Sequence, residues 1–309
     1  MAKKKTTAVM DDEKSRDGVP HGVEKIKIGD ILIMLFIGIL SLTCITPFIH
    51  LLAKSVSSSN AVMAKEVYFV AKGFNISMYE TIFKDGQLIH AMFYSVYMTM
   101  IFTVLGLVVC TCAAYPLSKK RLKGRTFFSF ILMIPMYFSA GLIPTYLLYK
   151  DLNLLDSMWV LILPLIFSPY NMLIMRSFFQ SSIPDSLEES AFLDGATNFQ
   201  ILFRIVLPLS KSIIATLLLF YAVGRWNAFA DAQYYITTKS LKPIQLLLSD
   251  MVRNAADSAT SLAEGSAATN TPEIYQAAAI MFASVPILCI YPFVQKYFVK
   301  GVMVGAVKG

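Results

Sequence analysis

Long apolar runs separated by short charged segments dominate the chain. A helix needs about 20 mostly apolar residues to cross a bilayer, and six stretches meet this requirement. They cover residues 31–53, 91–117, 127–149, 158–179, 205–229 and 275–298. Several contain proline, which membrane helices tolerate because neighbouring groups satisfy the freed carbonyl. The pattern therefore predicts an all-α integral membrane protein with six transmembrane helices.

The polar segments between these spans differ in charge, and this difference predicts their orientation. Residues 1–27 are rich in lysine and arginine, and so is the segment KKRLKGR at 119–125. Because basic loops tend to stay on the cytoplasmic side, we expect both segments and both termini to be cytoplasmic. The chain then reads as a disordered cytoplasmic tail over 1–27 and one six-helix membrane domain over 28–309.

Two longer polar segments, 54–90 and 231–274, would face outward in this topology. The first contains MYETIFKDGQLIHAMF, which predicts a short surface helix. The second is rich in Ala, Ser, Thr, Asn and Asp. Loops of that length are usually functional or disordered, so we expect a loop of this kind.

Composition narrows the class further. The 309 residues are 56% hydrophobic and 15% charged, with a net charge of +7, whereas soluble domains carry about 25% charged residues. The basic residues cluster beside apolar runs, which argues against nucleic-acid binding. All four cysteines lie in apolar runs without metal-ligand spacing and suit small buried hydrophobes. Scattered histidines and the lack of a nucleophile elbow disfavour an enzyme.

The polar segment between the fourth and fifth spans has the signals of a well-formed helix. Ser186 and Glu189 fit a capping box, Pro184 suits a first turn, and Gly195 is a natural C-terminal stop. These signals predict a short cytoplasmic helix at about 184–195, followed by a second helix that continues into the fifth span.

The faces of this short helix can also be predicted. Leu187, Ala191 and Phe192 fall roughly on one face, and Glu188 and Glu189 lie off it. The helix is then either a solvated surface helix with good ends or an amphipathic element that passes motion from a docked partner into the membrane.

This segment resembles the EAA motif of ABC importer permeases. Glu189-Ser190-Ala191, three residues, Gly195, nine residues and then the run Ile205 to Pro208 follow the family's spacing, with serine replacing the middle alanine. YAVGRWNAF at 221–229 and YFVKGVMVGAVKG at 297–309 resemble further segments of sugar permeases. Nearly the whole chain is covered, and it is most similar to the carbohydrate type, in an LplC/YtcP-like subclass with a maltose-permease-like fold.

The resemblance implies a function and a set of partners. The chain would be a permease subunit of an ATP-driven importer of oligosaccharides or complex glycans in a bacterial plasma or inner membrane. Its partners would be a second homologous permease in a heterodimer, two cytoplasmic ATPase subunits and an extracytoplasmic solute-binding protein. It would bind no cofactor, because it has no G-x-x-x-x-G-K-[ST] loop, and ATP and Mg would lie on the ATPase.

The resemblance also implies site residues. The ATPase-coupling residues would be Glu188, Glu189, Ser190, Ala191, Asp194, Gly195, Leu207 and Pro208. The residues along the substrate pathway would be Tyr221, Arg225, Trp226 and Asn227, with Asn171 from the fourth span as a weaker candidate.

Three of the five pathway residues also have a structural interpretation. Arg225 either lines the pathway, where it would favour an acidic glycan, or extends to the outer headgroups. Trp226 suits the interfacial aromatic belt, and Asn171 suits contact with another helix.

Two other transporter classes remain open. The motif spacing alone also permits an ABC permease for a non-sugar solute. An ion-coupled secondary transporter is disfavoured because no Asp or Glu lies inside a predicted span, and such carriers need titratable groups at membrane depth.

Overall fold

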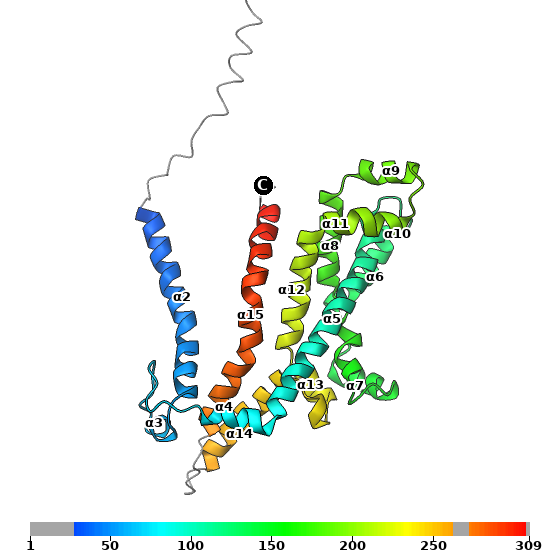
Figure 1. Cartoon of the computed structure of the whole chain (residues 1–309). Coiled ribbons are helices and arrows are strands. Elements are labelled where there is room, and N and C mark those ends of the chain that lie inside the picture. The colour runs from blue at the N-terminus through cyan, green and yellow to red at the C-terminus, as the bar shows by residue number, and fades with distance from the viewer. Residues whose placement is uncertain (1–27, 262–271, 307–309) are drawn as a thin grey trace, which may run out of the picture. The chain divides into compact units, whose positions relative to one another are not determined.

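The computed structural model describes residues 28–261 and 272–306, and their secondary structure is helical, without a β-strand (Figure 1). The all-α class is therefore confirmed for this part of the chain. The predicted tail at 1–27 lies outside the described residues. The chain divides into two compact units, and the boundary between them lies between His50 and Leu51, inside helix α2 (Ile28–Ser55).

The described part of the first unit is the N-terminal portion of α2, which is apolar and exposed on all sides. The whole of α2 has 28 residues and extends about 42 Å at 1.5 Å per residue. The hydroxyls of Ser41, Thr43 and Thr46 donate to carbonyls four residues earlier, at 2.8, 2.9 and 2.7 Å. Because these polar groups are satisfied within the helix, this surface is suited to lipid.

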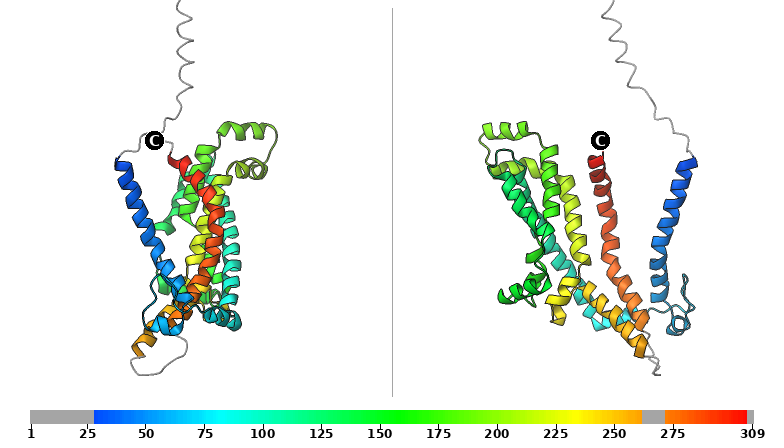
Figure 2. Two further views of the ribbon diagram at one scale, coloured as in Figure 1. Left: turned by 60° about the vertical axis from the view of Figure 1, so that its left-hand side comes forward. Right: turned by 180° about the vertical axis from the view of Figure 1, so that it is seen from behind.

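The second unit contains the remaining helices. They are α3 (Ser59–Met63), α4 (Ser77–Asp85), α5 (Gln87–Ser118), α6 (Arg125–Tyr137), α7 (Leu142–Asp151), η1 (Met158–Leu161), η2 (Leu163–Leu165), α8 (Pro169–Ser182), α9 (Asp185–Leu193), α10 (Asn198–Ile201), η3 (Leu202–Val206), α11 (Leu207–Leu209), α12 (Lys211–Asn227), α13 (Ala230–Tyr235), η4 (Lys239–Leu241), α14 (Ile244–Ser261) and α15 (Pro272–Ala306). Within this unit, α9 to α11 lie at one end, and α7, α13 and α14 lie at the other (Figure 2).

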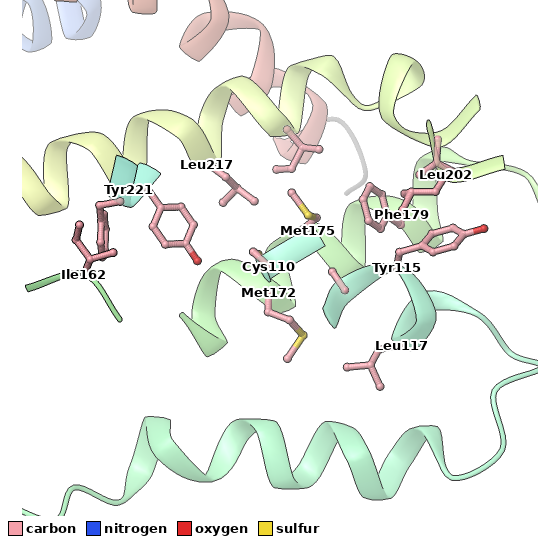
Figure 3. Close-up of a cluster of buried hydrophobic side chains, with 14 of the residues drawn as sticks. Cys110, Tyr115, Leu117, Ile162, Met172, Met175, Phe179, Leu202, Leu217 and Tyr221 are labelled. Carbon is pink, nitrogen blue, oxygen red and sulfur yellow. The ribbon is translucent and has the colours of Figure 1, made fainter. Parts of the chain in front are cut away.

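Helix α5 is central to this unit and packs against α8 and α12. Their buried side chains form the main apolar core, which includes Cys110, Met175 and Leu217 (Figure 3). A Cβ at Gly106 of α5 would lie 2.7 Å from the Tyr221 ring, so glycine permits this close approach. A second core joins α4, the start of α5, α14 and α15, and includes Trp226.

Three described helices are long and apolar enough to cross a membrane: α2, α5 and the part of α15 over Glu273–Pro292. Three further crossings would each consist of a bent pair. The bends are 111° between α6 and α7, 46° between the η1–η2 segment and α8, and 83° between the α10–α11 segment and α12. The predicted third, fourth and fifth spans are therefore not single straight helices.

Each bend has a local cause. Gly141 adopts a left-handed φ of +85° between α6 and α7, a conformation that glycine tolerates best. The fourth segment begins as short 3₁₀ turns, and α8 starts at Pro169 with the Ser168 side chain accepting from the Asn171 amide. Pro208 lies in the short α11 just before the third bend, and proline removes a helical hydrogen bond.

The segments predicted to face outward contain more helix than expected. The predicted surface helix at 78–93 is divided by Gly86, where α4 ends and α5 begins, and Met78 and Ile82 of α4 are buried. The predicted loop at 231–274 contains most of α13 and all of α14. Ile244, Leu247 and Leu248 of α14 are buried in the second core, at a spacing that corresponds to one helix face.

Candidate functional site

Helix α9 occupies the position of the predicted coupling helix and has a well-defined end. Gly195 has a φ of +82°. Its amide donates to the Phe192 carbonyl at 3.0 Å, and the Ala196 amide donates to the Ala191 carbonyl at 2.9 Å. This pair of bonds is a Schellman motif. The predicted stop at Gly195 is confirmed, and it fixes the direction in which the chain leaves α9.

The predicted start near residue 184 agrees with the observed first helical residue, Asp185, but the capping box predicted for Ser186 is wrong. Pro184 is the N-cap residue, so Ser186 lies inside the first turn and makes no capping bond. A capping box does occur, but one helix later: Thr197 caps α10, with the Thr197 amide donating to Gln200 Oε1 at 2.8 Å. Both tetrads match the capping-box pattern, and the one that follows Gly195 makes the bonds.

The buried face of α9 also differs from the predicted one. Glu188 and Ala191 are buried, whereas Leu187 is 40% exposed. Glu188 forms an ion pair with Lys119, which lies just after the end of α5, and both side chains are largely shielded from solvent. Glu188 therefore anchors α9 to the rest of the unit rather than lying off the packed face.

The neighbouring basic residues contact the same region. Lys120 forms an ion pair with Asp185 at 3.1 Å. Arg121 donates to Asn198 Oδ1 at 2.5 Å, and its guanidinium lies 4.1 Å from the centre of the Phe192 ring. The segment 119–121 thus contacts both α9 and α10, which holds the two helices in a defined arrangement.

The opposite face of α9 is open. Glu189, Ser190 and Asp194 are exposed, and Leu193 is 90% exposed. This face of a firmly held helix is therefore accessible to another protein. The sequence interpretation did not include Leu193, although its position one turn after Glu189 could have identified it.

The chain continues from α10 through a π-helical turn, η3, in which the Leu207 amide donates to the Leu202 carbonyl. Pro208 is exposed and Leu207 is partly buried against the main core. π turns are rare and occur often at functional sites. The predicted coupling residues 207 and 208 therefore lie at the joint between the coupling segment and α12, although their coupling role stays a prediction.

The five predicted pathway residues do not form one open site. Tyr221 and Asn171 are buried on α12 and α8, and Tyr221 packs edge-on against Phe102 with ring centroids 5.8 Å apart. Trp226 is buried in the second core. Asn227 is exposed, and its amide donates to the Val223 carbonyl at 3.0 Å.

Arg225 does not extend to the surface of the described chain. Its guanidinium makes two bonds to Asp231, at 2.5 and 3.0 Å, and one to the Leu161 carbonyl at 3.0 Å. Asp231 lies six residues further along, at the start of the predicted outer segment 231–274, and the sequence pattern did not identify it as the partner of Arg225. The pair balances the buried charge, so Arg225 offers no free positive charge to a solute.

Comparison with known proteins identifies the family. Residues 104–304 match the model of the binding-protein-dependent transport system inner membrane component. The chain belongs to this family. It is therefore a membrane permease component of a transporter and not the subunit that hydrolyses ATP.

Similar proteins cover nearly the full chain. The polygalacturonan/rhamnogalacturonan transport system permease protein YtcP of Bacillus subtilis (strain 168) is 39% identical, covering 92% of this chain and 100% of YtcP. Protein LplC of the same strain is 37% identical, covering 94% of this chain and 98% of LplC. The predicted resemblance to carbohydrate ABC permeases of the LplC/YtcP-like type is confirmed.

A solved structure supports the same fold. A chain of a bacterial ABC transporter involved in the import of the acidic polysaccharide alginate aligns with a TM-score of 0.80 and 30% identity, covering 91% of this chain and all of that chain. The fold is therefore that of an ABC importer permease. Such a permease acts with a partner permease, an ATPase and a solute-binding protein.

Proposed function

We propose that this chain is one half of a heterodimeric permease that imports oligosaccharides across a bacterial plasma membrane. Two ATPase subunits, which bind ATP and Mg, drive it, and an external binding protein delivers the solute. The observation that carries the proposal is the seating of α9. The helix is anchored through Glu188 and ended at Gly195, yet Glu189, Leu193 and Asp194 are exposed.

Firm anchoring of α9 matters because a docked ATPase must move more of the permease than α9 alone. The Glu188–Lys119 pair links α9 to the end of α5, and the chain after Gly195 continues through α10 and η3 to α12. A push on the exposed face of α9 is thereby transmitted to two core helices. Alternating access requires movement of the core helices, and this connection is the route by which movement of α9 reaches them.

The proposed topology has six crossings, with each bent pair counted as one, and both termini in the cytoplasm. The basic segment 119–121 contacts α9 and α10, which supports placing both on the same side. Because basic loops favour the cytoplasm, that side also suits docking of an ATPase.

The proposed solutes are oligosaccharides that carry uronic acids. YtcP is named for polygalacturonan and rhamnogalacturonan transport, and the structural relative is named for the acidic polysaccharide alginate. Arg225 does not carry this proposal, because Asp231 already balances its charge. Among the predicted pathway residues, exposed Asn227 remains the candidate for sugar contact.

The experiment has two steps. Affinity purification of the tagged chain from its own membranes in mild detergent should recover a second permease, an ATPase and a binding protein. The recovered complex, reconstituted in vesicles, should then take up labelled oligogalacturonates only with ATP inside and the binding protein outside. Neutral malto-oligosaccharides are the matched substrate control.

Each step has a contrary result. Recovery without an ATPase, or uptake driven by an ion gradient in the absence of ATP, would overturn the ABC mechanism. ATP-driven uptake of neutral oligosaccharides alone would agree with the proposed ABC mechanism but would contradict the proposal that the substrates are acidic.

A further inference from the structure

A cavity of about 460 Å³ lies between the end of α5, the segment that follows it and α10. Its walls are mainly apolar and include Tyr115, Phe199 and Leu202. Three basic residues, Lys119, Arg121 and Lys123, line it as well, and no acidic residue does. The cavity therefore offers an apolar surface beside positive charge.

The three basic residues are not equivalent. Lys119 forms an ion pair with Glu188, and Arg121 is hydrogen-bonded to Asn198. Lys123 is exposed and has no acidic partner within 4.0 Å among the described residues. The cavity thus retains an uncompensated positive charge at Lys123.

An apolar track leads into the cavity along α5. Val104, Val108 and Cys112 are exposed at four-residue spacing, which places them on one face of the helix, and Cys112 lines the cavity. No described side chain of the second unit buries this face. The track runs along a helix long enough to cross the membrane, so its apolar face is suited to acyl chains.

The segment formed by α10 and η3 adds an interfacial element. Phe199 is 74% exposed and Phe203 is exposed on the next turn, followed by exposed Arg204. The α10–α11 segment is bent by 83° from α12, so it lies across the membrane end if α12 spans the bilayer. Exposed aromatics beside a basic residue on such a segment are typical of helices that lie in the lipid headgroup region.

We propose that this cavity binds an anionic phospholipid. Its phosphate faces Lys123 and Arg121, and its acyl chains follow the apolar track of Val104 and Val108. Basic pockets on the cytoplasmic side of membrane helices suit anionic headgroups. The apolar walls favour a lipid over a soluble anion. Because Lys119 and Asn198 also line the cavity, the bound lipid contacts the residues that position α9 and α10.

This inference goes beyond solute transport and does not depend on which sugar is carried. It links membrane composition to the position of α9 and α10. Lipid in the cavity stabilises the arrangement of the end of α5 and α10, on which the orientation of α9 depends.

The test uses the assembled transporter with its partner subunits, purified in detergent and titrated with phosphatidylglycerol or phosphatidylcholine under native mass spectrometry. Lys123→Gln should weaken phosphatidylglycerol binding about fivefold, which corresponds to ~1 kcal/mol per basic residue near an anionic surface. Lys123→Arg should retain binding. Lys211→Gln is the matched control, because Lys211 is an exposed lysine of α12 that does not line the cavity.

A second variant tests the apolar part of the site. Phe199→Ser should weaken phosphatidylglycerol binding while leaving the thermal stability of the complex unchanged, because Phe199 is largely exposed. Three results would overturn the proposal. They are equal binding of the two lipids, equal losses in Lys123→Gln and Lys211→Gln, and equally tight binding of soluble glycerol phosphate, which would indicate a site for free anions. A photocrosslinker at residue 123 that captures a partner protein in place of lipid would also overturn it.

Discussion

Arg225 shows how a single buried charge is accommodated inside a membrane protein. Its side chain is 1% exposed and forms a two-pronged bond with Asp231, supplemented by the Leu161 carbonyl. Removing one partner of a buried pair leaves an uncompensated charge, which is far more costly than losing the pair's net attraction. The pair therefore stabilises the junction between α12 and α13 only as long as both partners are present.

Asp231→Asn should accordingly destabilise the transporter by about 3–5 kcal/mol, because it leaves the guanidinium buried without a counter-charge. Replacing both residues, as Arg225→Met with Asp231→Leu, should recover most of the loss. Thermal unfolding of the purified complex measures the effect. Asp250→Asn is the control, since Asp250 pairs with Lys242 in a more exposed setting. Equal shifts in Asp231→Asn and Asp250→Asn would contradict this role.

Asp156 provides a second, titratable contact at the residue scale. Its carboxylate accepts from the Thr238 hydroxyl at 2.6 Å and from the Thr238 and Thr237 amides at 2.8 and 2.9 Å. The Thr238 hydroxyl bond is the largest cause that lowers the pKa of Asp156 below its usual 3.8. A lowered carboxyl pKa contributes stability that is fully present above the unfolded-state value and is lost as the pH falls through the folded-state value.

The stability difference between the wild type and Asp156→Asn should therefore be constant from about pH 5 to 8 and should narrow below pH 3.8. Asparagine keeps the amide-accepting oxygen but cannot ionise. Unfolding midpoints across this pH range provide the measurement. A difference that changes between about pH 5 and 8 would show that another group is responsible.

At the scale of elements, the joint after α9 matters more than any one contact. Gly195 sets the exit direction, the Thr197–Gln200 capping box starts α10, and the π turn η3 with Pro208 leads to the 83° bend before α12. No atom lies within 4 Å of a Cβ built on Gly195. The glycine is therefore required for its backbone conformation and not for space.

Substitutions at position 195 test whether backbone conformation, and not side-chain space, is what requires glycine there. Transport should fall in the order Gly195, Gly195→Asn, Gly195→Ala and Gly195→Val, because a left-handed conformation costs non-glycine residues about 1–2 kcal/mol and asparagine tolerates it best. Gly195→Asp should abolish transport while membrane insertion is retained, because it adds a second carboxylate beside exposed Asp194 on the docking face, a cost beyond that of the backbone. ATP-dependent uptake in vesicles is the readout. Gly224→Ala is the control, since Gly224 lies in α12 with open space and no positive φ. Normal uptake in Gly195→Val would show that the backbone conformation after α9 is not needed for transport.

The Glu188–Lys119 pair gives a prediction for the same element. Glu188→Lys and Lys119→Glu should each lower ATP-coupled uptake, because each leaves like charges facing one another in a shielded site. The combined exchange should recover part of the loss. A matching exchange of the exposed Lys120–Asp185 pair should have little effect, since exposed pairs contribute little. Additive losses without recovery would contradict the anchoring role.

For α9, the sequence predicted where the backbone ends the helix but did not predict which residues the helix contacts. The stop at Gly195 could be predicted because it depends on one residue's conformational freedom. The predicted capping box at Ser186 was wrong because two tetrads fit the same pattern and the sequence does not rank them. The burial of Glu188 could not be predicted, since its partner Lys119 lies 69 positions earlier in the chain.

At the scale of the whole molecule, hydropathy predicted where apolar segments occur but not their direction. Length and apolarity are sums over a window, so they do not record a change of axis at Gly141 or Pro208. The same composition-based view classified 231–274 as a loop, although the apolar residues of α14 recur at helical spacing. Family and class were accessible from the motif because its residues and spacing are local in the sequence.

The central claim is that the exposed face of α9 docks on the ATPase. The most direct test places a single cysteine at Leu193, with the four native cysteines replaced, and treats the assembled transporter with a short bifunctional crosslinker. We expect a covalent product between this chain and the ATPase for Leu193→Cys, and none for Lys84→Cys, an exposed position on α4 at the other end of the unit. Capture of the ATPase from Lys84→Cys but not from Leu193→Cys would contradict the account.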